Sequence, residues 1–168
     1  MPDLKLEILQ ELPFSSKEEE ALLNLIRTSD CLHRAMQRRT KEWGVTTTQY
    51  NVLRILRGAQ PHGLTCAAIG SRMLTAEPDI TRLLGRLQKL KLIKQARDKH
   101  DRRVVWTRIA MQGLKLLLAM DPAVETAPKE FLGHMDKTDV AELIRLLEVA
   151  RKSGEEMAAE NGEGRVTN

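Results

Sequence analysis

The sequence predicts a mainly α-helical fold with one small β-hairpin, an α+β class, for three reasons. The chain has 168 residues, enough for one domain whose core needs no disulfide or metal ion. Hydrophobic residues make up 42% but aromatic residues only 3%, and an aliphatic composition favours helices over a β-sandwich. The run from Val104 to Thr107 is β-branched and aromatic, and it predicts a strand.

Length and composition exclude several classes of protein. The chain is far too short for a TIM barrel and short for a Rossmann enzyme with a second domain. Two cysteines, Cys31 and Cys66, exclude a disulfide scaffold. No charged leader with an apolar segment opens the chain, and no stretch approaches the ~18 apolar residues of a membrane span. We therefore expect a soluble, cytoplasmic protein without a membrane partner.

The first helix is predicted from its capping residues. Residues 1–14 form an irregular or partly helical arm. Ser15 or Ser16, each with a glutamate three residues later, gives a capping-box pattern that opens a long helix. Apolar residues continue at helical spacing until Gly44, which ends the helix.

Two shorter helices come next. Thr46 and Gln49 form a capping box for a helix that stops near residues 58–61. Thr65 caps a short helix over residues 65–74.

A fourth helix is predicted over residues 75–93, with Thr75 as its cap and Pro78 in its first turn, where a missing N–H costs little. Its two faces differ in character. The apolar face carries Ile80, Leu83, Leu84 and Leu87, and the cationic face carries Arg82, Arg86 and Lys89.

The C-terminal part is predicted to be helical with interruptions. Residues 111–120 continue the helical spacing, and Pro122 and Pro128 are expected to break or kink the segment beyond residue 120. Asp136 and Asp139 then open a last helix.

Positive charge is concentrated in the centre of the chain. Residues 72–103 hold ten basic and four acidic residues, so this segment carries +6 while the whole chain carries +4. A basic segment on an otherwise acidic protein is typical of polyanion binding, although a solvated helix face has the same composition.

The order of the elements gives the charge a structural meaning. Three helices followed by the hairpin over residues 93–109 is the order of a winged helix-turn-helix. In such a fold, the second helix of the helix-turn-helix fits the DNA major groove. The charged tip of the hairpin reaches the adjacent minor groove.

Two stretches, DITRLLGRLQKLKLI and RDKHDRRVVWTRIAMQG, resemble the MarR family of bacterial transcription regulators. The resemblance covers residues 16–151. Its motifs are a Thr-Arg-Leu core in the recognition helix, an Asp-x-Arg wing and a glycine in the next helix. Here these are Thr81-Arg82-Leu83, Asp101-Arg102-Arg103 and Gly113. Lys91 replaces the glycine that usually follows the recognition helix, so we expect that turn to be built differently, and Ala110 replaces a capping threonine.

The resemblance implies a homodimer and a division of the chain into four parts. Residues 1–44 are an N-terminal arm and dimerisation helix, and residues 45–110 are the DNA-binding lobe. Residues 111–153 are C-terminal dimerisation helices, and residues 154–168 are a flexible acidic tail.

Double-stranded DNA is the predicted partner. On the recognition helix, Arg82 and Arg86 contact phosphates or guanine edges. Thr81 donates to a base or phosphate, contacts a thymine methyl group, or has no role. Asp79 either accepts from a cytosine amino group or bonds to first-turn N–H groups of its own helix.

In the wing, the resemblance implies that Arg103 enters the minor groove and that Asp101 orients it by a charge-assisted hydrogen bond. A wing ion pair without DNA contact is the alternative. Lys99 and Arg102 supply phosphate contacts. Asp98 is expected to stabilise the hairpin.

The function predicted from these features is a dimeric, ligand-responsive repressor that binds a palindromic operator. The family often binds small aromatic effectors, for which His33, Met36, Trp43 and Tyr50 are the candidate contacts, although core packing is the simpler role for each.

Three other functions remain open. In a redox-responsive regulator, Cys31 or Cys66 senses oxidants, although buried, inert thiols are expected at both positions. The second alternative is a winged-helix module that binds a protein partner and has no sequence-specific DNA binding. An enzyme is disfavoured because the sequence shows no catalytic constellation, no cofactor motif and no metal-ligand spacing.

Overall fold

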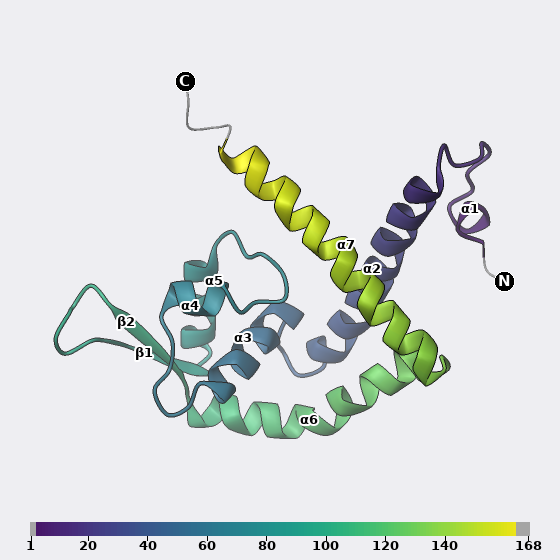
Figure 1. Ribbon diagram of the computed structural model, residues 1–168. Helices are drawn as coiled ribbons and strands as arrows, with labels where there is room; N and C mark the ends of the chain where they lie inside the picture. The colour runs from purple at the N-terminus through teal and green to yellow at the C-terminus, as the bar shows by residue number, and fades with distance from the viewer. Residues whose placement is uncertain (1–2, 164–168) are drawn as a thin grey trace. The chain divides into compact units, whose positions relative to one another are not determined.

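The computed structural model describes the backbone of residues 3–163 and the side chains of residues 3–154. It confirms the predicted class, a helical protein with one two-stranded antiparallel hairpin (Figure 1). No helix in this part of the chain combines the length and apolar character that crossing a membrane requires. The elements are α1 (Leu4–Glu7), α2 (Lys17–Lys41), α3 (Thr47–Gly58), α4 (Cys66–Gly70), α5 (Ile80–Lys89), β1 (Ile93–Arg97), β2 (Val105–Ile109), α6 (Met111–Leu132) and α7 (Lys137–Glu163).

The chain divides into two compact units, Met1–Glu125 and Thr126–Asn168, and α6 contributes residues to both. The core of the first unit joins α3, α4, α5, the hairpin and the first half of α6. Most of its fully buried side chains are apolar, and each of these contributes about 1.5–3 kcal/mol by leaving water. They include Leu53, Leu56, Ile69, Leu84, Leu87, Leu117 and Met120.

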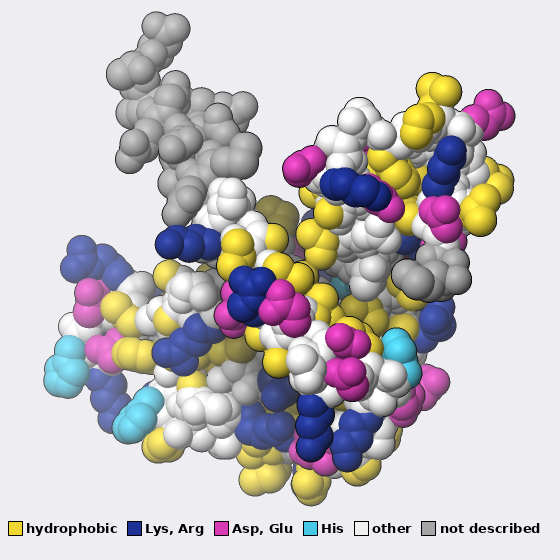
Figure 2. Space-filling view, turned by 45° about the vertical axis from the view of Figure 1, so that its right-hand side comes forward, with side chains coloured by type: hydrophobic (Ala, Val, Ile, Leu, Met, Phe, Trp, Pro, Cys, Tyr) yellow, Lys and Arg dark blue, Asp and Glu magenta, His cyan; other side chains and the backbone are white. Residues whose placement is uncertain are grey.

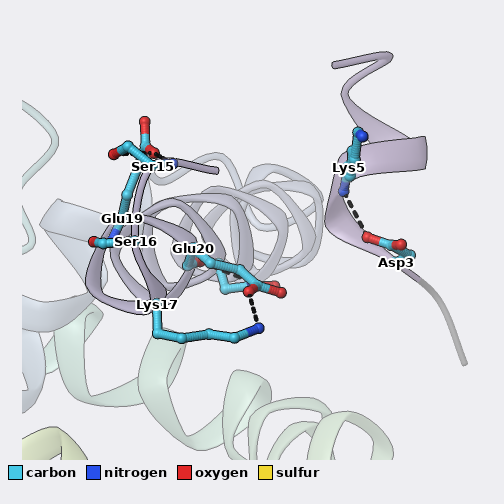
Figure 3. Close-up of polar contacts among 8 residues, drawn as sticks. Asp3, Lys5, Ser15, Ser16, Lys17, Glu19 and Glu20 are labelled. Atoms are coloured by element: carbon cyan, nitrogen blue, oxygen red, sulfur yellow. Dashed lines mark hydrogen bonds and ion pairs between the residues drawn. The ribbon is translucent and has the colours of Figure 1, made fainter. Parts of the chain in front are cut away.

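The start of α2 matches the predicted capping pattern, and Ser15 and Ser16 have different roles in it (Figure 3). Ser16 is the N-cap, and its hydroxyl accepts the backbone N–H of Glu19 at 3.1 Å. The Glu19 carboxylate in turn accepts the backbone N–H and the hydroxyl of Ser15. Three residues beyond the helix, Gly44 adopts a left-handed conformation with φ +73° and turns the chain into α3.

The caps of α3 and α4 are also as predicted. Thr46 and Gln49 form a reciprocal capping box, with distances of 3.1 Å and 2.9 Å. The Thr65 hydroxyl accepts the N–H of Ala68 at the start of α4. Just before α4, Leu64 pairs with Thr107 of β2 through two backbone hydrogen bonds. The short helix α4 is therefore tied to the hairpin.

The start of α5 differs from the prediction. The helix begins at Ile80 and Asp79 is its N-cap, so Thr75 and Pro78 lie in the preceding loop. A helix from Thr75 would need a helical conformation at Glu77, which the ring of the following proline disfavours. Asp79 supplies a competing cap, because its side chain accepts the N–H of Arg82 at 2.9 Å.

The end of α5 shows how this chain manages without the usual glycine. Lys91 adopts a left-handed conformation with φ +59°, and its N–H bonds to the carbonyl oxygen of Gln88. The N–H of Leu92 bonds to the carbonyl oxygen of Leu87. These two bonds make a Schellman motif, so the expectation of a differently built turn is wrong. A lysine occupies the glycine conformation instead.

The hairpin is confirmed, with Ile93 opposite Ile109 at its base and Arg97 opposite Val105 near its tip. It projects beyond the helices of the first unit (Figure 1). Gly113 packs against the hairpin base, where a Cβ atom would clash with the carbonyl oxygen of Leu92. This close approach gives the glycine of the family pattern a physical reason.

Of the break or kink expected at the prolines of α6, the break does not occur. The helix runs from Met111 to Leu132 through Pro122 and Pro128. A proline inside a helix costs about 3 kcal/mol, and burial of Leu117 and Met120 on the same helix offsets a cost of that size.

The last helix opens as predicted and extends further than expected. The Asp136 side chain accepts the N–H of Asp139 at 2.8 Å, next to the first turn of α7. The helix continues past Gly154 to Glu163, into the segment expected to be a flexible tail. Residues 164–168 of that tail lie outside the described residues.

Candidate nucleic-acid interface

The helix α5 separates an apolar face from a polar face as its sequence predicts. Leu83, Leu84 and Leu87 are buried in the core of the first unit. Thr81, Arg82, Arg86 and Lys89 are exposed to solvent. Burial of the leucines fixes how the helix is rotated, and this rotation keeps the cations on the outside.

The cations of this region are not neutralised by acidic neighbours. Among the residues with described side chains, Arg72, Arg82, Arg86 and Lys89 take part in no ion pair. Figure 2 shows Lys and Arg side chains dispersed among acidic and apolar ones over its visible face, with no single continuous basic patch. Unpaired, hydrated cations are suited to displace the counterions of a nucleic-acid backbone.

The structure shows one of the two roles expected for Asp79. One carboxylate oxygen accepts the first-turn N–H of Arg82, so the side chain caps α5 and complements the positive end of the helix dipole. The side chain is exposed. Contact with a base remains a prediction for this residue.

At the wing tip, the structure brings Asp101 and Arg103 together. The Asp101 carboxylate accepts the backbone N–H of Arg103 at 3.0 Å, and Nε and Nη2 of the guanidinium at 3.2 Å and 3.3 Å. These bonds hold the pKa of the Asp101 carboxyl below its ordinary value, with the guanidinium as the main cause. The Arg103 side chain keeps 91% of its surface exposed. The pair thus orients a cation that stays open to a partner.

The other wing residues separate into two groups. Lys99 and Arg102 are exposed at the tip. Asp98 stabilises the hairpin as expected, because it accepts the backbone N–H groups of His100 and Asp101. It also accepts the indole N–H of Trp106 at 2.9 Å, a bond that the sequence pattern does not predict. The only signal for this bond is strand register, which depends on the exact length of the turn.

A second contact that the sequence pattern does not predict anchors the loop before α5. The side-chain oxygen of Asn51 on α3 accepts the backbone N–H of Leu74 at 3.1 Å. The Leu74 side chain is exposed, so at this residue the backbone hydrogen bond makes the attachment, while the neighbouring Met73 packs against the core.

The four residues predicted to contact an effector lie in different surroundings. Tyr50 is buried in the core of the first unit, and burial raises the pKa of its phenol. Met36 is half-buried, and His33 and Trp43 are exposed. His33 lines an open hollow of about 450 Å³ on α2 together with Leu25, Ile26, Ser29 and Asp30. A second hollow, of about 560 Å³, lies at the junction of α2 and α3 beside Arg38 and Lys41.

The two cysteines also differ in their surroundings. Cys31 is exposed on α2, so the expectation of a buried thiol is wrong there. Cys66 is half-buried at the start of α4, with Sγ 4.0 Å from the Thr81 hydroxyl oxygen on α5. Within the residues whose side chains are described, no three or more His, Cys, Asp or Glu side chains are grouped to hold a metal ion.

Comparison with known proteins gives one consistent result. The family model described as "MarR family" matches residues 43–104. A MarR transcription factor from Planctomyces limnophilus is 36% identical, with a TM-score of 0.63 over 82% of this chain and 99% of that one. The MepR–DNA complex of S. aureus has a TM-score of 0.71 at 21% identity, over 85% of this chain and 99% of that one. Transcriptional regulator HosA of Escherichia coli O157:H7 is 23% identical over 121 residues, 69% of this chain and 88% of HosA. On these grounds the chain belongs to the MarR family, whose members are DNA-binding transcription regulators and not enzymes.

Proposed function

We propose that this protein is a sequence-specific repressor that reads DNA with α5 and the wing. The observation that carries the proposal is the exposed guanidinium of Arg103, oriented by Asp101 at the tip of a hairpin that projects from the first unit. Arg103 enters the minor groove, where a narrow groove attracts arginine. Lys99 and Arg102 contact phosphates on either side.

The recognition helix supplies the base contacts. Its N-terminal residues enter the major groove, with Arg82 and Arg86 on guanine edges or phosphates and Thr81 beside them. Asp79 keeps one carboxylate oxygen for a cytosine amino group while the other caps the helix. A bidentate arginine–guanine pair discriminates against a wrong base by about 1–3 kcal/mol.

The protein acts as a homodimer on a palindromic operator. Apolar side chains stay exposed on two helices of the chain, Leu22 and Ile26 on α2 and Ile144 and Val149 on α7. Burial of these residues between two copies supports the helix roles predicted for residues 1–44 and 111–153. A two-fold axis requires half-sites about 10 bp apart, or a multiple of that spacing.

A small aromatic effector releases the DNA. Two solved regulators of similar fold support this. The RdhR-CbdbA1625 regulator was solved with 2,4-dichlorophenol bound and has a TM-score of 0.75 at 16% identity. The DNA binding of Bordetella bronchiseptica BpsR, with a TM-score of 0.69 at 21% identity, is regulated by 6-hydroxynicotinic acid. An effector shifts this protein only as far as its affinities for the DNA-bound and the free arrangements differ. His33, Met36, Trp43 and Tyr50 stay the candidate contacts, and the cytoplasm stays the predicted location.

The test is selection of bound sequences from a random duplex pool with the wild type, Arg103→Ala and Lys17→Ala. Lys17 is a matched control, because its side chain is also 91% exposed and also paired with a carboxylate, but on α2. We expect an inverted repeat that Lys17→Ala selects unchanged. Arg103→Ala should lose selectivity at the outer positions that the wing reads.

The contrary result is equally clear. No enrichment at low salt, or a binding constant that does not fall as salt rises, would contradict DNA reading and favour the protein-binding module.

The position of Cys66 favours one variant of this function, in which oxidation regulates DNA binding. Its sulfur lies 4.0 Å from the Thr81 hydroxyl of α5, so a bulkier oxidised sulfur would press on the recognition helix. We expect peroxide to release DNA from the wild type and from Cys31→Ser but not from Cys66→Ser. Equal release from all three proteins would exclude this variant.

A further inference from the structure

The loop at the wing tip, residues 98–104, is organised around the carboxylate of Asp98. One oxygen accepts the backbone N–H groups of His100 at 2.8 Å and Asp101 at 3.0 Å. The other accepts the indole N–H of Trp106 at 2.9 Å. The backbone N–H of Asp98 also bonds to the carbonyl oxygen of Val104, which closes the loop. Asp98 therefore connects both strand ends with the turn between them.

Strand register explains how Trp106 reaches Asp98. Trp106 lies directly opposite Ala96, so Asp98, two residues further along the same strand face, is its diagonal neighbour. Diagonal neighbours are about 7–8 Å apart, within reach of an aromatic side chain. The small side chain of Ala96 leaves the indole room to lie across the hairpin. The bond is thus a product of this register and of an alanine–tryptophan pair.

The bonds continue from Trp106 to the guanidinium of Arg103. Asp98 holds the backbone N–H of Asp101, and the carboxylate of Asp101 holds the backbone and the guanidinium of Arg103. The Asp98 carboxylate therefore positions Asp101, and the Asp101 carboxylate positions the exposed guanidinium of Arg103. The same hydrogen bonds lower the pKa of the Asp98 carboxyl, so it stays an acceptor at neutral pH.

We propose that Asp98 and Trp106 are positioning residues for DNA binding, which set the orientation in which Arg103 meets the minor groove. The inference rests on the proposed function, because it takes Arg103 as the groove contact. A preoriented arginine loses less conformational freedom when it binds, so its affinity falls when the orienting bonds are removed. Neither residue needs to touch DNA for this effect.

The test is a double-mutant cycle on the selected operator duplex. Trp106→Phe keeps an aromatic ring on the strand and removes the indole N–H. We expect it to weaken binding about 3- to 10-fold in the wild type, the range for one lost hydrogen bond. It should change binding less than about 2-fold in the Arg103→Ala background, where no oriented cation remains.

Two further variants test the same bond from its other partner and control for the loss of a carboxylate elsewhere. Asp98→Asn keeps one oxygen for the turn N–H groups but turns an NH₂ group toward the indole, and we expect it to reproduce Trp106→Phe. Glu20→Gln makes the same chemical change in the Lys17–Glu20 pair on α2 and should leave binding unchanged. Repeating the duplex selection with each variant adds a second readout, because only the outer positions should lose their preference.

The outcomes separate this inference from the proposed function. Weaker binding by Arg103→Ala, with no effect of Trp106→Phe or Asp98→Asn, overturns this inference alone. An equal loss from Trp106→Phe in both backgrounds also overturns it, because the residue would then act on the fold and not through Arg103. A protein that selects no duplex, or that binds equally well without Arg103, overturns both.

Discussion

The wing tip and the junction of α3 with α6 each contain an arginine–aspartate pair, in different surroundings. At the tip, Arg103 and Asp101 keep 91% and 46% of their side-chain surface exposed. At the junction, Nη1 of Arg57 lies 2.7 Å from one oxygen of Asp121 and 3.0 Å from the other, with 35% and 24% exposed. The first pair joins residues two apart, and the second joins residues 64 apart.

The difference indicates what each pair does. An exposed pair close in sequence is screened by water and constrains little of the fold, so its effect is to orient a side chain. A half-buried pair between helices that are far apart in sequence leaves an uncompensated charge if one partner is removed. The first pair should therefore matter for binding and the second for stability.

The largest expected effect breaks the inner pair. Asp121→Ala leaves Arg57 half-buried without its carboxylate and should lower the free energy of unfolding by about 1–2 kcal/mol, less than for a fully buried pair because of the remaining exposure. The melting temperature should fall by about 2–8 °C. The control is Glu142→Ala, which breaks an exposed pair with Arg145 on α7 and should leave it unchanged. Equal melting temperatures for both variants would contradict the claim that the Arg57–Asp121 pair contributes more to stability than an exposed pair.

The next effect separates binding from stability at the tip. Arg103→Ala should weaken operator binding about 10-fold, since lost arginine–base contacts cost about 1–3 kcal/mol. Its melting temperature should match that of the wild type, because the side chain is almost fully exposed. Binding isotherms and thermal melts on the same preparations test both halves. A lowered melting temperature would show that the exposed pair supports the fold.

A smaller effect on stability is expected at Lys91, which belongs to neither ion pair. Lys91→Gly should raise the free energy of unfolding by about 0.5–1 kcal/mol, because glycine removes the strain of the left-handed conformation but adds freedom to the unfolded chain. Lys91→Ala keeps a Cβ atom and should give no such gain. Denaturant unfolding measures both, and a loss with glycine would contradict the strained turn.

The smallest effect concerns pH at the tip. Hydrogen bonds lower the pKa of Asp98 and of Asp101 from an ordinary value of 3.8, chiefly those from the Asp101 N–H and from the Arg103 side chain, respectively. A lowered pKa means that the stabilisation of the wing is complete at neutral pH and is lost only as pH falls below that value. In Trp43→Phe, Trp106 emission should be constant from pH 7 to about 4 and change below. A transition centred near pH 5 would contradict this.

Local rules predicted the features that depend on neighbours in the sequence. The Thr46–Gln49 capping box, the Asp136 cap and the apolar face of α5 all appear as predicted, because each needs only residues within one or two helical turns. The Asp101–Arg103 contact is also local, with two residues of separation, but its prediction came from the family resemblance.

The errors arose where a choice between local options depended on the rest of the fold. Thr75 and Asp79 are both good N-caps, and Asp79 is the one that α5 uses. The break that was one of two expected outcomes at Pro122 and Pro128 does not occur, because packing of the same helix outweighs the local preference. The bond from Trp106 to Asp98 needs the strand register, which a sequence pattern alone does not give.

The pairing of Leu64 with Thr107 has a mechanical consequence. Thr107 is fully buried, and its N–H donates to the Leu64 carbonyl oxygen at 2.8 Å just ahead of α4. In hydrogen exchange, the amides of Leu64 and Thr107 should open only with the whole lobe, whereas the tip amides, which bond only within the loop over residues 98–104, should exchange by local opening of that loop. The wing is then held at its base, where β2 is bonded to Leu64 just ahead of α4. Because Leu64 is bonded to β2 at this point, a tilt of α4 should carry the base of the wing with it.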